Sequence, residues 1–247
     1  MEPGRDGTDL DSSQLSEGTL RYDGATLETF YHANNWRKYW ISRVCSYISG
    51  DVAEIGAGLG ANTLLINRCG VRSIFCLEPD EELAALLRVA VRNVEGVTTS
   101  VGSIRDLSGH AFDCIVYIDV LEHIEDDKSE LERACLLLRP SGRLIVLAPA
   151  HQALYSPFDR AIGHHRRYDS GSLKSCAPPW LRLEKMEYLD SVGLLASALN
   201  RFVLRQSAPT LRQILLWDRV MIPVSKVLDP WLRHHFGKSI MAVWVRG

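Results

Sequence analysis

The segment Val52-Ala-Glu-Ile-Gly-Ala-Gly-Leu-Gly-Ala-Asn-Thr63 specifies a strand that runs into a tight turn and then into a helix. The apolar run over residues 51–55 comes directly before Gly56, and Gly58 and Gly60 follow at every second position. Glycine permits the sharp turn and lets a ligand approach the backbone closely. The segment therefore predicts the first strand–turn–helix unit of a doubly wound α/β sheet, with a ligand at the turn.

More short runs of apolar and β-branched residues follow this unit. Such runs suit strands that are buried on both faces of a parallel sheet. Helical spacing over 62–69, 80–93 and 127–138 separates the runs, and this alternation indicates right-handed crossovers. Strands are expected over residues 51–55, 73–77, 97–101, 113–118 and 143–148.

The two ends of the chain depart from this alternation. Residues 1–20 are polar and aperiodic, which is typical of a disordered leader, and 149–180 form a long polar stretch. We expect one domain over 21–247, with a cofactor half over 51–150 and an acceptor loop and helical cap over 151–238. The remaining expected elements are helices over 26–48, 191–205 and 210–229 and strands over 181–189 and 239–245.

The bulk composition excludes several classes of protein. The net charge of −2 over 247 residues lacks the basic excess of a nucleic-acid reader, so no nucleic-acid partner is expected. The start of the chain does not resemble a secretory signal, and no apolar run approaches the ~20 residues that an integral membrane segment needs. The six cysteines have no CxxC spacing, so they are expected to be reduced core residues in a cytoplasmic protein without a metal.

Three acidic residues indicate which ligand the glycine turn binds. Glu78 follows Gly60 by eighteen residues and ends the second expected strand, where a carboxylate accepts hydrogen bonds from ribose hydroxyls. Glu54 precedes the turn and Asp119 ends the fourth expected strand. Negative charge there favours the cationic S-adenosylmethionine over a pyrophosphate. GAGLGA also fits the dinucleotide pattern, so a nicotinamide-dependent oxidoreductase remains an alternative.

Four motifs over about residues 51–150 resemble those of class I S-adenosylmethionine-dependent methyltransferases. EIGAGLG and CLEPD resemble the first two, LLLRPSGRLIVLAPA resembles the passage into the fifth strand, and DCIVYIDVLEHIEDD is similar to the branch that includes quinone-biosynthesis methyltransferases. The resemblance implies a Rossmann-like, doubly wound seven-stranded sheet, mostly parallel with the last strand antiparallel. An N-terminal helix and a helical insertion before the last strand belong to the same expectation.

The resemblance also implies a set of cofactor-binding residues. The acidic and glycine motifs would hold the donor, and the turns after the third and fourth strands would flank the adenine. Ser103 stands where the family usually has an acid, so its hydroxyl would accept from the adenine amino group. The expected residues are Glu54, Gly56, Ala57, Gly58, Gly60, Glu78, Pro79, Ser103, Ile104, Asp119, Val120 and Leu121.

The flanking segments are similar to bacterial methyltransferases that often accompany glycosyltransferases. Residues 33–36 lie at the place of a lead-in helix that contains Asn and Trp. Residues 154–159 and 163–168 resemble the loop after the fifth strand, and residues 237–240 resemble the start of the last strand.

The loop over 151–168 is expected to receive the methyl acceptor, because ligands of open α/β sheets lie beyond the carboxyl ends of strands. His151 and His164 are the candidate bases for a hydroxyl acceptor, with Tyr168 and Asp159 as orienting partners. Two alternatives stay open. In the first, Asp159 and Arg166 or Arg167 form a salt bridge that holds the loop closed and has no role in the reaction. In the second, the two arginines bind a phosphate or carboxylate on the acceptor. His123 is expected at a helix start or beside the adenine, and a metal at His164, His165 and Asp159 lacks recognisable ligand spacing.

The segment over 211–232 places apolar residues close to helical spacing, and we expect these to pack into the core or cap. A lipid-facing or dimerising surface is the alternative, so the protein is expected to be a monomer or homodimer. Basic residues that recur every seven positions are usually a solvated stripe, and the alternative is a contact with anionic lipid or a lipid-linked sugar. The apolar set is Leu211, Ile214, Leu215, Met221, Leu228 and Trp231, and the basic set is Arg205, Arg212, Arg219, Lys226 and Arg233.

These observations predict S-adenosylmethionine-dependent methyl transfer to a small-molecule acceptor, at oxygen, in secondary or glycan-related metabolism. Amino-methylation of nucleic acid is disfavoured, because the Asp/Asn-Pro-Pro-aromatic motif is absent after the fourth strand. A protein that binds the cofactor without transferring methyl, as a binding partner or in another reaction, is the first alternative. The nicotinamide-dependent oxidoreductase is the second.

Overall fold

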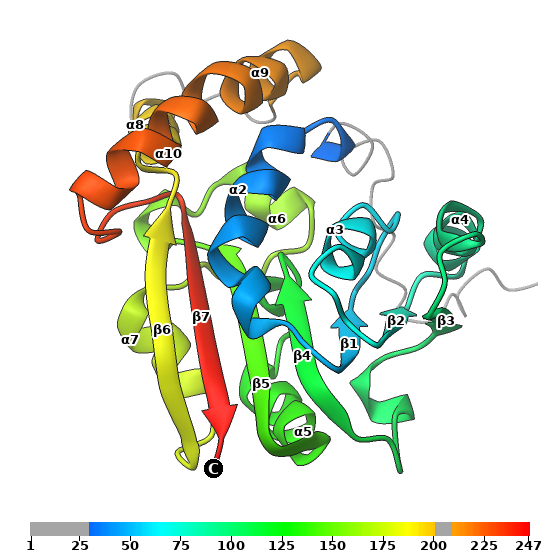
Figure 1. Ribbon diagram of the computed structural model, residues 1–247. Coiled ribbons are helices and arrows are strands. Elements are labelled where there is room, and N and C mark those ends of the chain that lie inside the picture. Colours follow the sequence, from blue (N-terminus) through cyan, green and yellow to red (C-terminus); the bar gives the residue numbers. More distant parts are fainter. Residues whose placement is uncertain (1–29, 201–208) are drawn as a thin grey trace, which may run out of the picture.

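A computed structural model describes residues 30–200 and 209–247 and contains one seven-stranded sheet (Figure 1). The strand order is β3-β2-β1-β4-β5-β7-β6, so the expected doubly wound fold is confirmed. The expected leader, and the parts of the expected helices over 26–29 and 201–205, lie outside the described residues. The strands are β1 (Asp51–Ile55), β2 (Ser73–Glu78), β3 (Val97–Val101), β4 (Phe112–Ile118), β5 (Leu138–Pro149), β6 (Leu181–Leu189) and β7 (Ser239–Arg246).

The strand pairing brings the expected site residues to one edge of the sheet. β1 pairs in parallel with β2 on one side and β4 on the other, so the strand order reverses beside the glycine turn. β7 lies between β5 and β6 and is antiparallel to both, as expected for the last strand. The carboxyl ends of β1, β2, β4 and β5 therefore share one edge, which is where open α/β sheets bind ligands.

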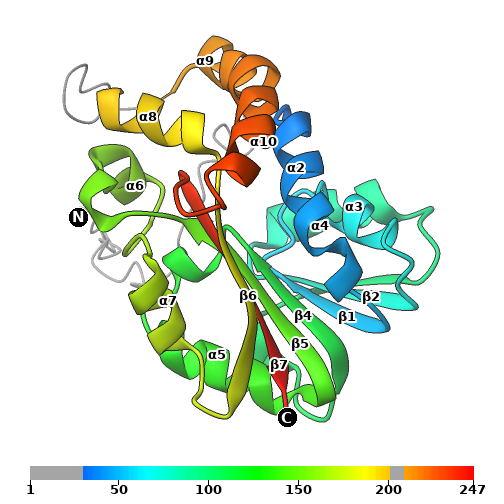
Figure 2. The ribbon, with the colours of Figure 1, turned by 60° about the vertical axis from the view of Figure 1, so that its left-hand side comes forward.

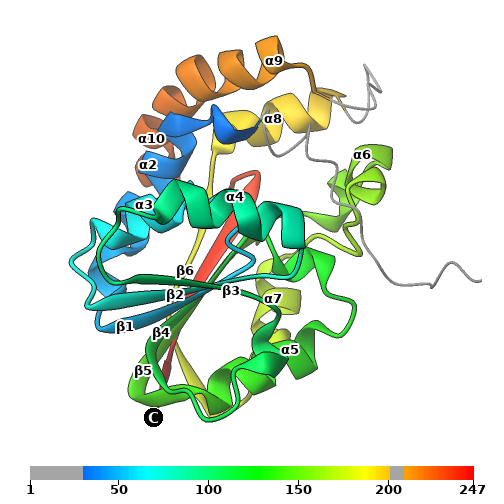
Figure 3. The same ribbon diagram turned by 90° about the vertical axis from the view of Figure 1, so that its right-hand side faces the viewer.

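Helices cover both faces of the sheet (Figure 3). α2 (Asn34–Val44), α3 (Thr63–Asn67) and α4 (Glu81–Val91) pack on one face, and α5 (Asp127–Leu136) and α7 (Ser170–Cys176) pack on the other. α4 begins where the Asp80 carboxylate accepts the backbone N–H groups of Glu82 and Leu83, each at 2.9 Å. Two separate apolar cores result, one on each face of the sheet.

The polar stretch over 149–180 contains two short helices that we did not expect. α6 (Pro157–Ala161) begins at a capping box, in which Ser156 and Asp159 each satisfy a backbone N–H of the other. α7 begins at a second capping box, formed by Asp169 and Ser172. Both helices are shorter than two turns, so apolar periodicity does not reveal them.

A helical cap follows β6 and packs beside α2 (Figure 2). It consists of α8 (Ser191–Leu199), α9 (Leu211–Leu216), a π-helical turn (Trp217–Met221) and α10 (Ile222–Trp231). The Asp218 carboxylate of this cap accepts the backbone N–H groups of Asn35 (3.1 Å) and Trp36 (2.8 Å). The residue before α2, Ala33, makes no side-chain hydrogen bond to the first backbone N–H groups of this helix. Asp218, more than 180 residues further along the chain, accepts two of them instead.

The expected packing of the cap's apolar residues is confirmed for half of the set and wrong for the rest. Ile214 is buried and Leu215 and Met221 are half-buried, with Met221 against the core, whereas the side chains of Leu211 and Leu228 are exposed and Trp231 is 84% exposed. The buried face of these helices also carries Asp218 and Asp229, whose hydrogen bonds attach the cap to α2. The alternative of an exposed apolar surface is the one that the structure supports. No helix among the described residues is long and apolar enough to cross a membrane.

The expectation of six reduced cysteines is wrong for one pair. Cys45 and Cys69 form a disulfide with a Cα–Cα distance of 5.4 Å, whereas Cys76, Cys114, Cys135 and Cys176 are free and buried. Cys45 follows α2 and Cys69 follows α3, and these two helices pack together. The pairing depends on this tertiary contact, which a sequence separation of 24 does not reveal.

Candidate active site

The three glycines of the first turn have different surroundings. Gly56, Gly58 and Gly60 all have positive φ, in the left-handed region that favours glycine. A Cβ atom on Gly56 would lie 2.6 Å from Val120, and one on Gly60 would lie 2.8 Å from Leu87. A Cβ atom on Gly58 would meet no atom of residues 30–200 and 209–247 within 4 Å. Gly56 and Gly60 therefore allow close packing, while Gly58 faces open space that a ligand can enter.

Glu78 ends β2 beneath this turn and has a fixed orientation. One carboxylate oxygen accepts the backbone N–H of Gly58 at 2.8 Å, and the other accepts that of Asp80 at 3.1 Å. Burial raises the pKa of Glu78, and the two backbone N–H groups partly oppose this rise. Each oxygen keeps a further lone pair, so the carboxylate can still accept from two neighbouring hydroxyls. The adjacent Pro79 is exposed beside it.

Glu54 is buried in β1 and supports the helix after the turn. Its carboxylate accepts the Thr63 hydroxyl at 2.6 Å, and Thr63 begins α3. Burial raises the pKa of Glu54 to about 7, although the hydrogen bonds from Thr63 and Cys76 oppose this rise. A cation bound at the turn would favour the charged form of this group.

The turns after β3 and β4 supply the other expected cofactor residues. The Ser103 hydroxyl accepts from the backbone N–H of Arg105 and donates to Asp106, so it caps a single helical turn over Ile104–Asp106. Ile104, like Ala57 in the first turn, is buried. After β4, Leu121 is buried in the core, while Val120 packs against Gly56.

Asp119 is the residue at which β4 ends. Its φ is +54° and its side chain is exposed. Desolvation of the carboxyl group by the surrounding protein raises the pKa of Asp119 to about 6, and the charge of Lys238 opposes this rise. The carboxylate is therefore accessible to a ligand and changes its charge close to neutral pH.

His151 lies at the start of the loop after β5. Its φ is +66°, its ring stacks on Tyr188 with centroids 5.2 Å apart, and Nε2 lies 3.0 Å from the Gly237 carbonyl oxygen. A carbonyl oxygen only accepts, so Nε2 carries the proton of this bond and the neutral ring keeps a lone pair on Nδ1. This arrangement is compatible with a general base.

Asp159, His164 and Arg167 form a buried clasp within the same loop. Asp159 accepts both Arg167 Nε (2.9 Å) and Nη2 (3.0 Å), and it also accepts the Ser156 hydroxyl. His164 Nδ1 lies 3.1 Å from Asp159. Despite burial, the hydrogen bonds from His164 and Arg167 hold the pKa of Asp159 well below its usual range. Asp159 thus pairs with Arg167, as in the alternative of a salt-bridged clasp. The Arg167 guanidinium is therefore already bound to a protein carboxylate.

Tyr168 lies on the other side of this loop, in the core that packs against α5. Its side chain is buried, and its hydroxyl donates to Asp127 at 2.8 Å. Arg166 also pairs with Asp127, at 2.6 Å, and donates to the Glu125 carbonyl. Tyr168 thus orients the loop rather than an acceptor, and the Arg166 guanidinium is occupied by protein groups.

Glu122, to which sequence reasoning gave no role, lies in a single helical turn over Leu121–His123. Its side chain is fully buried, and neither carboxylate oxygen has a hydrogen-bond partner in the part of the chain that the structure describes. Burial raises the pKa of Glu122 well above its usual range, and the charge of Asp119 adds to this effect. The sequence signal was the placement of an acid three residues after Asp119, between apolar neighbours.

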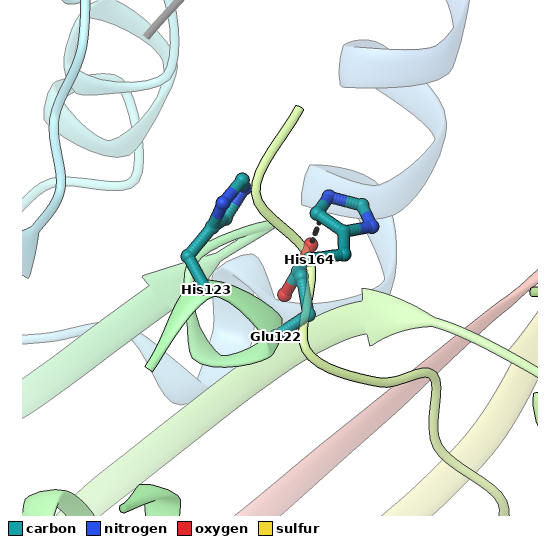
Figure 4. A group of neighbouring side chains, drawn as sticks. All are labelled: Glu122, His123 and His164. Atoms are coloured by element: carbon teal, nitrogen blue, oxygen red, sulfur yellow. Dashed lines mark ion pairs between the residues drawn. The ribbon is translucent and has the colours of Figure 1, made fainter. Parts of the chain in front are cut away.

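His123 and His164 complete this part of the edge. Their rings meet edge to face with centroids 4.5 Å apart, and His164 Nε2 lies 3.7 Å from Glu122 Oε1 (Figure 4). Burial lowers the pKa of His123 to about 3, and the neighbouring His164 adds to this effect. The same edge of the sheet thus carries the open face of Gly58 beside the Glu78 carboxylate and, beyond β4 and β5, a group of titratable side chains.

Comparison with known proteins identifies the domain. Residues 53–146 match the family model described as a methyltransferase domain. The chain thus carries a class I S-adenosylmethionine-dependent methyltransferase domain, and S-adenosylmethionine is its cofactor. The nicotinamide alternative is thereby replaced. No curated protein matches the sequence.

Solved structures show the same fold at low sequence identity. The N-methyltransferase NodS from Bradyrhizobium japonicum WM9 has a TM-score of 0.56 and 13% identity, over 87% of this chain and 96% of that chain. An S-adenosylmethionine-dependent methyltransferase from Mesorhizobium loti has a TM-score of 0.55 and 15% identity, over 81% and 93%. The [4+2]-cyclase SpnF has a TM-score of 0.59 and 14% identity, over 86% and 81%.

Proposed function

We propose that this methyltransferase domain transfers the methyl group of S-adenosylmethionine to a hydroxyl oxygen of a small molecule, in secondary or glycan-related metabolism. A hydroxyl must lose its proton when its oxygen attacks the methyl carbon. The observation that carries the proposal is a pair of histidines, His151 and His164, each with one ring nitrogen held by an acceptor of the protein. In each neutral ring the other nitrogen keeps its lone pair.

The donor would lie across the carboxyl edge between β1, β2 and β4. The proposal places the ribose hydroxyls on Glu78, beside the open face of Gly58, and the adenine between the turns at Ser103 and Val120. The sulfonium and ammonium groups then lie toward Asp119, whose charge favours them. Support comes from the exposed Asp119 carboxylate, the open space at Gly58 and the fixed carboxylate of Glu78.

The proposed reaction is a single displacement. The acceptor hydroxyl gives its proton to the histidine lone pair, its oxygen forms a bond to the methyl carbon, and the carbon–sulfur bond breaks. The products are the methyl ether, protonated histidine and S-adenosylhomocysteine. Positioning the oxygen in line with the carbon–sulfur bond at about 3 Å supplies much of the rate.

Labelled-methyl transfer tests this function. The purified chain is incubated with methyl-labelled S-adenosylmethionine and a panel of sugars, phenols and polyketide-like acceptors. We expect His151→Asn or His164→Ala to lower turnover about 100-fold, because general-base catalysis contributes that much or more. Asparagine is used at position 151 because it tolerates positive φ.

The matched control is His110→Asn, at the opposite edge of the sheet, which should leave turnover unchanged. Both active-edge variants should keep their affinity for S-adenosylhomocysteine. Normal turnover in both variants removes the histidine base from the proposal. Donor binding without transfer to any acceptor favours the non-methylating alternative.

The exposed face of the cap supports an acceptor that is presented at an anionic membrane surface. Leu216, Val220, Val224, Val227 and Trp231 follow one another at three- or four-residue spacing, and all five side chains are exposed. Such an apolar stripe beside a basic face is typical of a helix that lies on a membrane. Exposed basic residues accompany the stripe: Arg212, Arg219 and Lys226 lie on these helices, and Arg233 follows the end of α10.

The position of this stripe relates it to the proposed reaction. Figure 1 shows α9 and α10 beyond the ends to which β4 and β6 point, which is the end that carries the site. A lipid-linked acceptor held at the stripe would therefore face the same end of the molecule as the donor. The proposal keeps the cytoplasmic location expected from the sequence; the four free cysteines are compatible with it, whereas the Cys45–Cys69 disulfide is more typical of an oxidising compartment.

Sedimentation with vesicles checks this surface. The chain should bind vesicles that contain phosphatidylserine and should bind pure phosphatidylcholine vesicles weakly, with the difference reduced at high salt. Changing Val227 and Trp231 together to serine should weaken binding at least about fivefold, because two large apolar side chains leave the lipid. Leu86→Ser, an exposed change on α4, serves as the control. A wild-type dimer that this double change dissociates would instead identify a second copy as the partner.

A further inference from the structure

Glu122 presents a buried carboxyl group that has no hydrogen-bond partner among the described residues. The carboxyl group is fully buried at the end of β4, and neither oxygen forms a hydrogen bond to another residue within the described parts of the chain. An unsatisfied buried carboxyl group is costly, and native structures retain one where strain, a catalytic role, an ordered water or a bound ion accounts for it. The proposed methyl transfer uses Glu122 in no step.

Two imidazole groups converge on this carboxyl group. One ligand atom each from Glu122, His123 and His164 lies within 4.8 Å of the other two. Figure 4 shows Glu122 and His123 rising from the turn after β4 and His164 facing them from the loop after β5. Two sequence-distant segments therefore bring an oxygen and two nitrogens to one point.

The group of atoms matches the donor set of a transition-metal site. Two histidines and one carboxylate bind zinc in catalytic sites and leave further positions open, and related sets bind iron or manganese. Zinc takes such oxygen and nitrogen atoms at about 2.0–2.2 Å, so ligand atoms around one ion lie roughly 3.3 Å apart. The 3.7 Å between His164 Nε2 and Glu122 Oε1 is close to this spacing.

His164 also has the supporting contact that metal-binding histidines have. Its Nδ1 is held by Asp159 at 3.1 Å, which directs Nε2 toward Glu122. Asp159 is in turn fixed by Arg167 and Ser156. A carboxylate that accepts the second ring nitrogen orients the histidine for the ion and strengthens the metal bond.

We propose that Glu122, His123 and His164 form a binding site for one divalent transition-metal ion such as zinc. The buried clasp of Asp159 and Arg167 is then a support for a metal ligand rather than only a lid contact. In a role that rests on the proposed methyl transfer, the open positions of a bound ion would be available to the acceptor oxygen. His151 then remains as the base.

Zinc titration of the full chain tests the site. The protein is freed of metal with a chelator and titrated with zinc chloride by calorimetry. We expect one ion per chain, and we expect Glu122→Gln and His164→Asn each to weaken zinc binding at least about tenfold. Glutamine keeps the shape of glutamate but removes its charge, so the test isolates the ligand chemistry.

His165→Asn is the matched control, because His165 is the exposed neighbour of His164 and only its backbone N–H contacts Glu122. This variant should bind zinc like the wild type. Each variant is also titrated with S-adenosylhomocysteine, and retained affinity shows that the donor edge is folded.

A wild type that binds no zinc, or a Glu122→Gln variant that binds zinc as tightly as the wild type, overturns the inference. Because zinc binding is measured without an acceptor, its failure is distinct from failure of the proposed function. Zinc binding without methyl transfer contradicts only the proposed function, and methyl transfer in a chain that binds no zinc contradicts only the metal site.

Discussion

Replacing Glu78 with alanine is expected to weaken binding of S-adenosylhomocysteine by about 1–3 kcal/mol, through the loss of charged hydrogen bonds to the ribose. The variant also releases the backbone N–H of Gly58, which Glu78 holds at 2.8 Å. The glycine turn then loses the contact that fixes its open face. Calorimetric titration of the full chain measures the change.

The free energy of unfolding of this variant should change little. The raised pKa of Glu78 shows that burying its charged carboxylate costs free energy, and removing the group relieves this cost as it removes the two hydrogen bonds. Glu78→Gln keeps one oxygen acceptor and should fall between the wild type and Glu78→Ala. Glu81→Ala removes an exposed acid from the first turn of α4 and should leave affinity unchanged. Equal affinity in Glu78→Ala and the wild type would refute the ribose assignment.

Replacing Asp229 with alanine is expected to lower the free energy of unfolding by about 3–5 kcal/mol. Its fully buried carboxylate accepts the Tyr39 hydroxyl at 2.7 Å and the backbone N–H groups of Asp190 (2.7 Å) and Ser191 (3.1 Å). These bonds join α10 to α2 and to the start of α8. Without Asp229, all three buried donors lose their partner.

Urea denaturation measures this loss. Asp229→Asn keeps one acceptor oxygen and is expected to be destabilised less than Asp229→Ala. The cap should separate from α2 in the alanine variant, which protease sensitivity near residues 209–232 would report. A loss of less than about 1 kcal/mol would mean that the cap is held by its other contacts.

The sheet was predictable because its strands have strong local signals. The expected bounds of β1, β3 and β6 agree with the structure, since their apolar runs are flanked by clear turns. β5 begins five residues earlier than expected, at Leu138, because its pairing with β4 shifts register between Phe112 and Cys114. Local sequence pattern does not specify such an irregularity.

The cofactor edge was predictable for the same local reason, whereas the acceptor side was not. The three glycines directly follow the first strand, and Glu78 is the last residue of the second, so a short stretch of sequence is enough to identify each of them. The partners of Asp159 and Tyr168 depend on how the loop after β5 folds over β4. Glu122 resembled an ordinary helix-start acid, and only the buried turn after β4 shows that its carboxyl group lacks partners.

The central claim is that acidic groups at this edge favour a cationic donor. S-adenosylmethionine carries a sulfonium charge that S-adenosylhomocysteine lacks. The pKa values of Asp119 and Glu54 are raised to about 6 and about 7, so both groups gain negative charge as the pH rises from 5 to 7. The preference for S-adenosylmethionine should therefore increase over this interval.

The most direct measurement is the ratio of the two affinities at pH 5 and pH 7, in the wild type and in Asp119→Asn. The ratio should shift toward S-adenosylmethionine by about five- to tenfold in the wild type, and by clearly less in Asp119→Asn. Lys238 and Glu122 lie near Asp119 in both proteins, so the comparison isolates the Asp119 charge. A ratio that does not change with pH, or that changes equally in both proteins, would contradict the account.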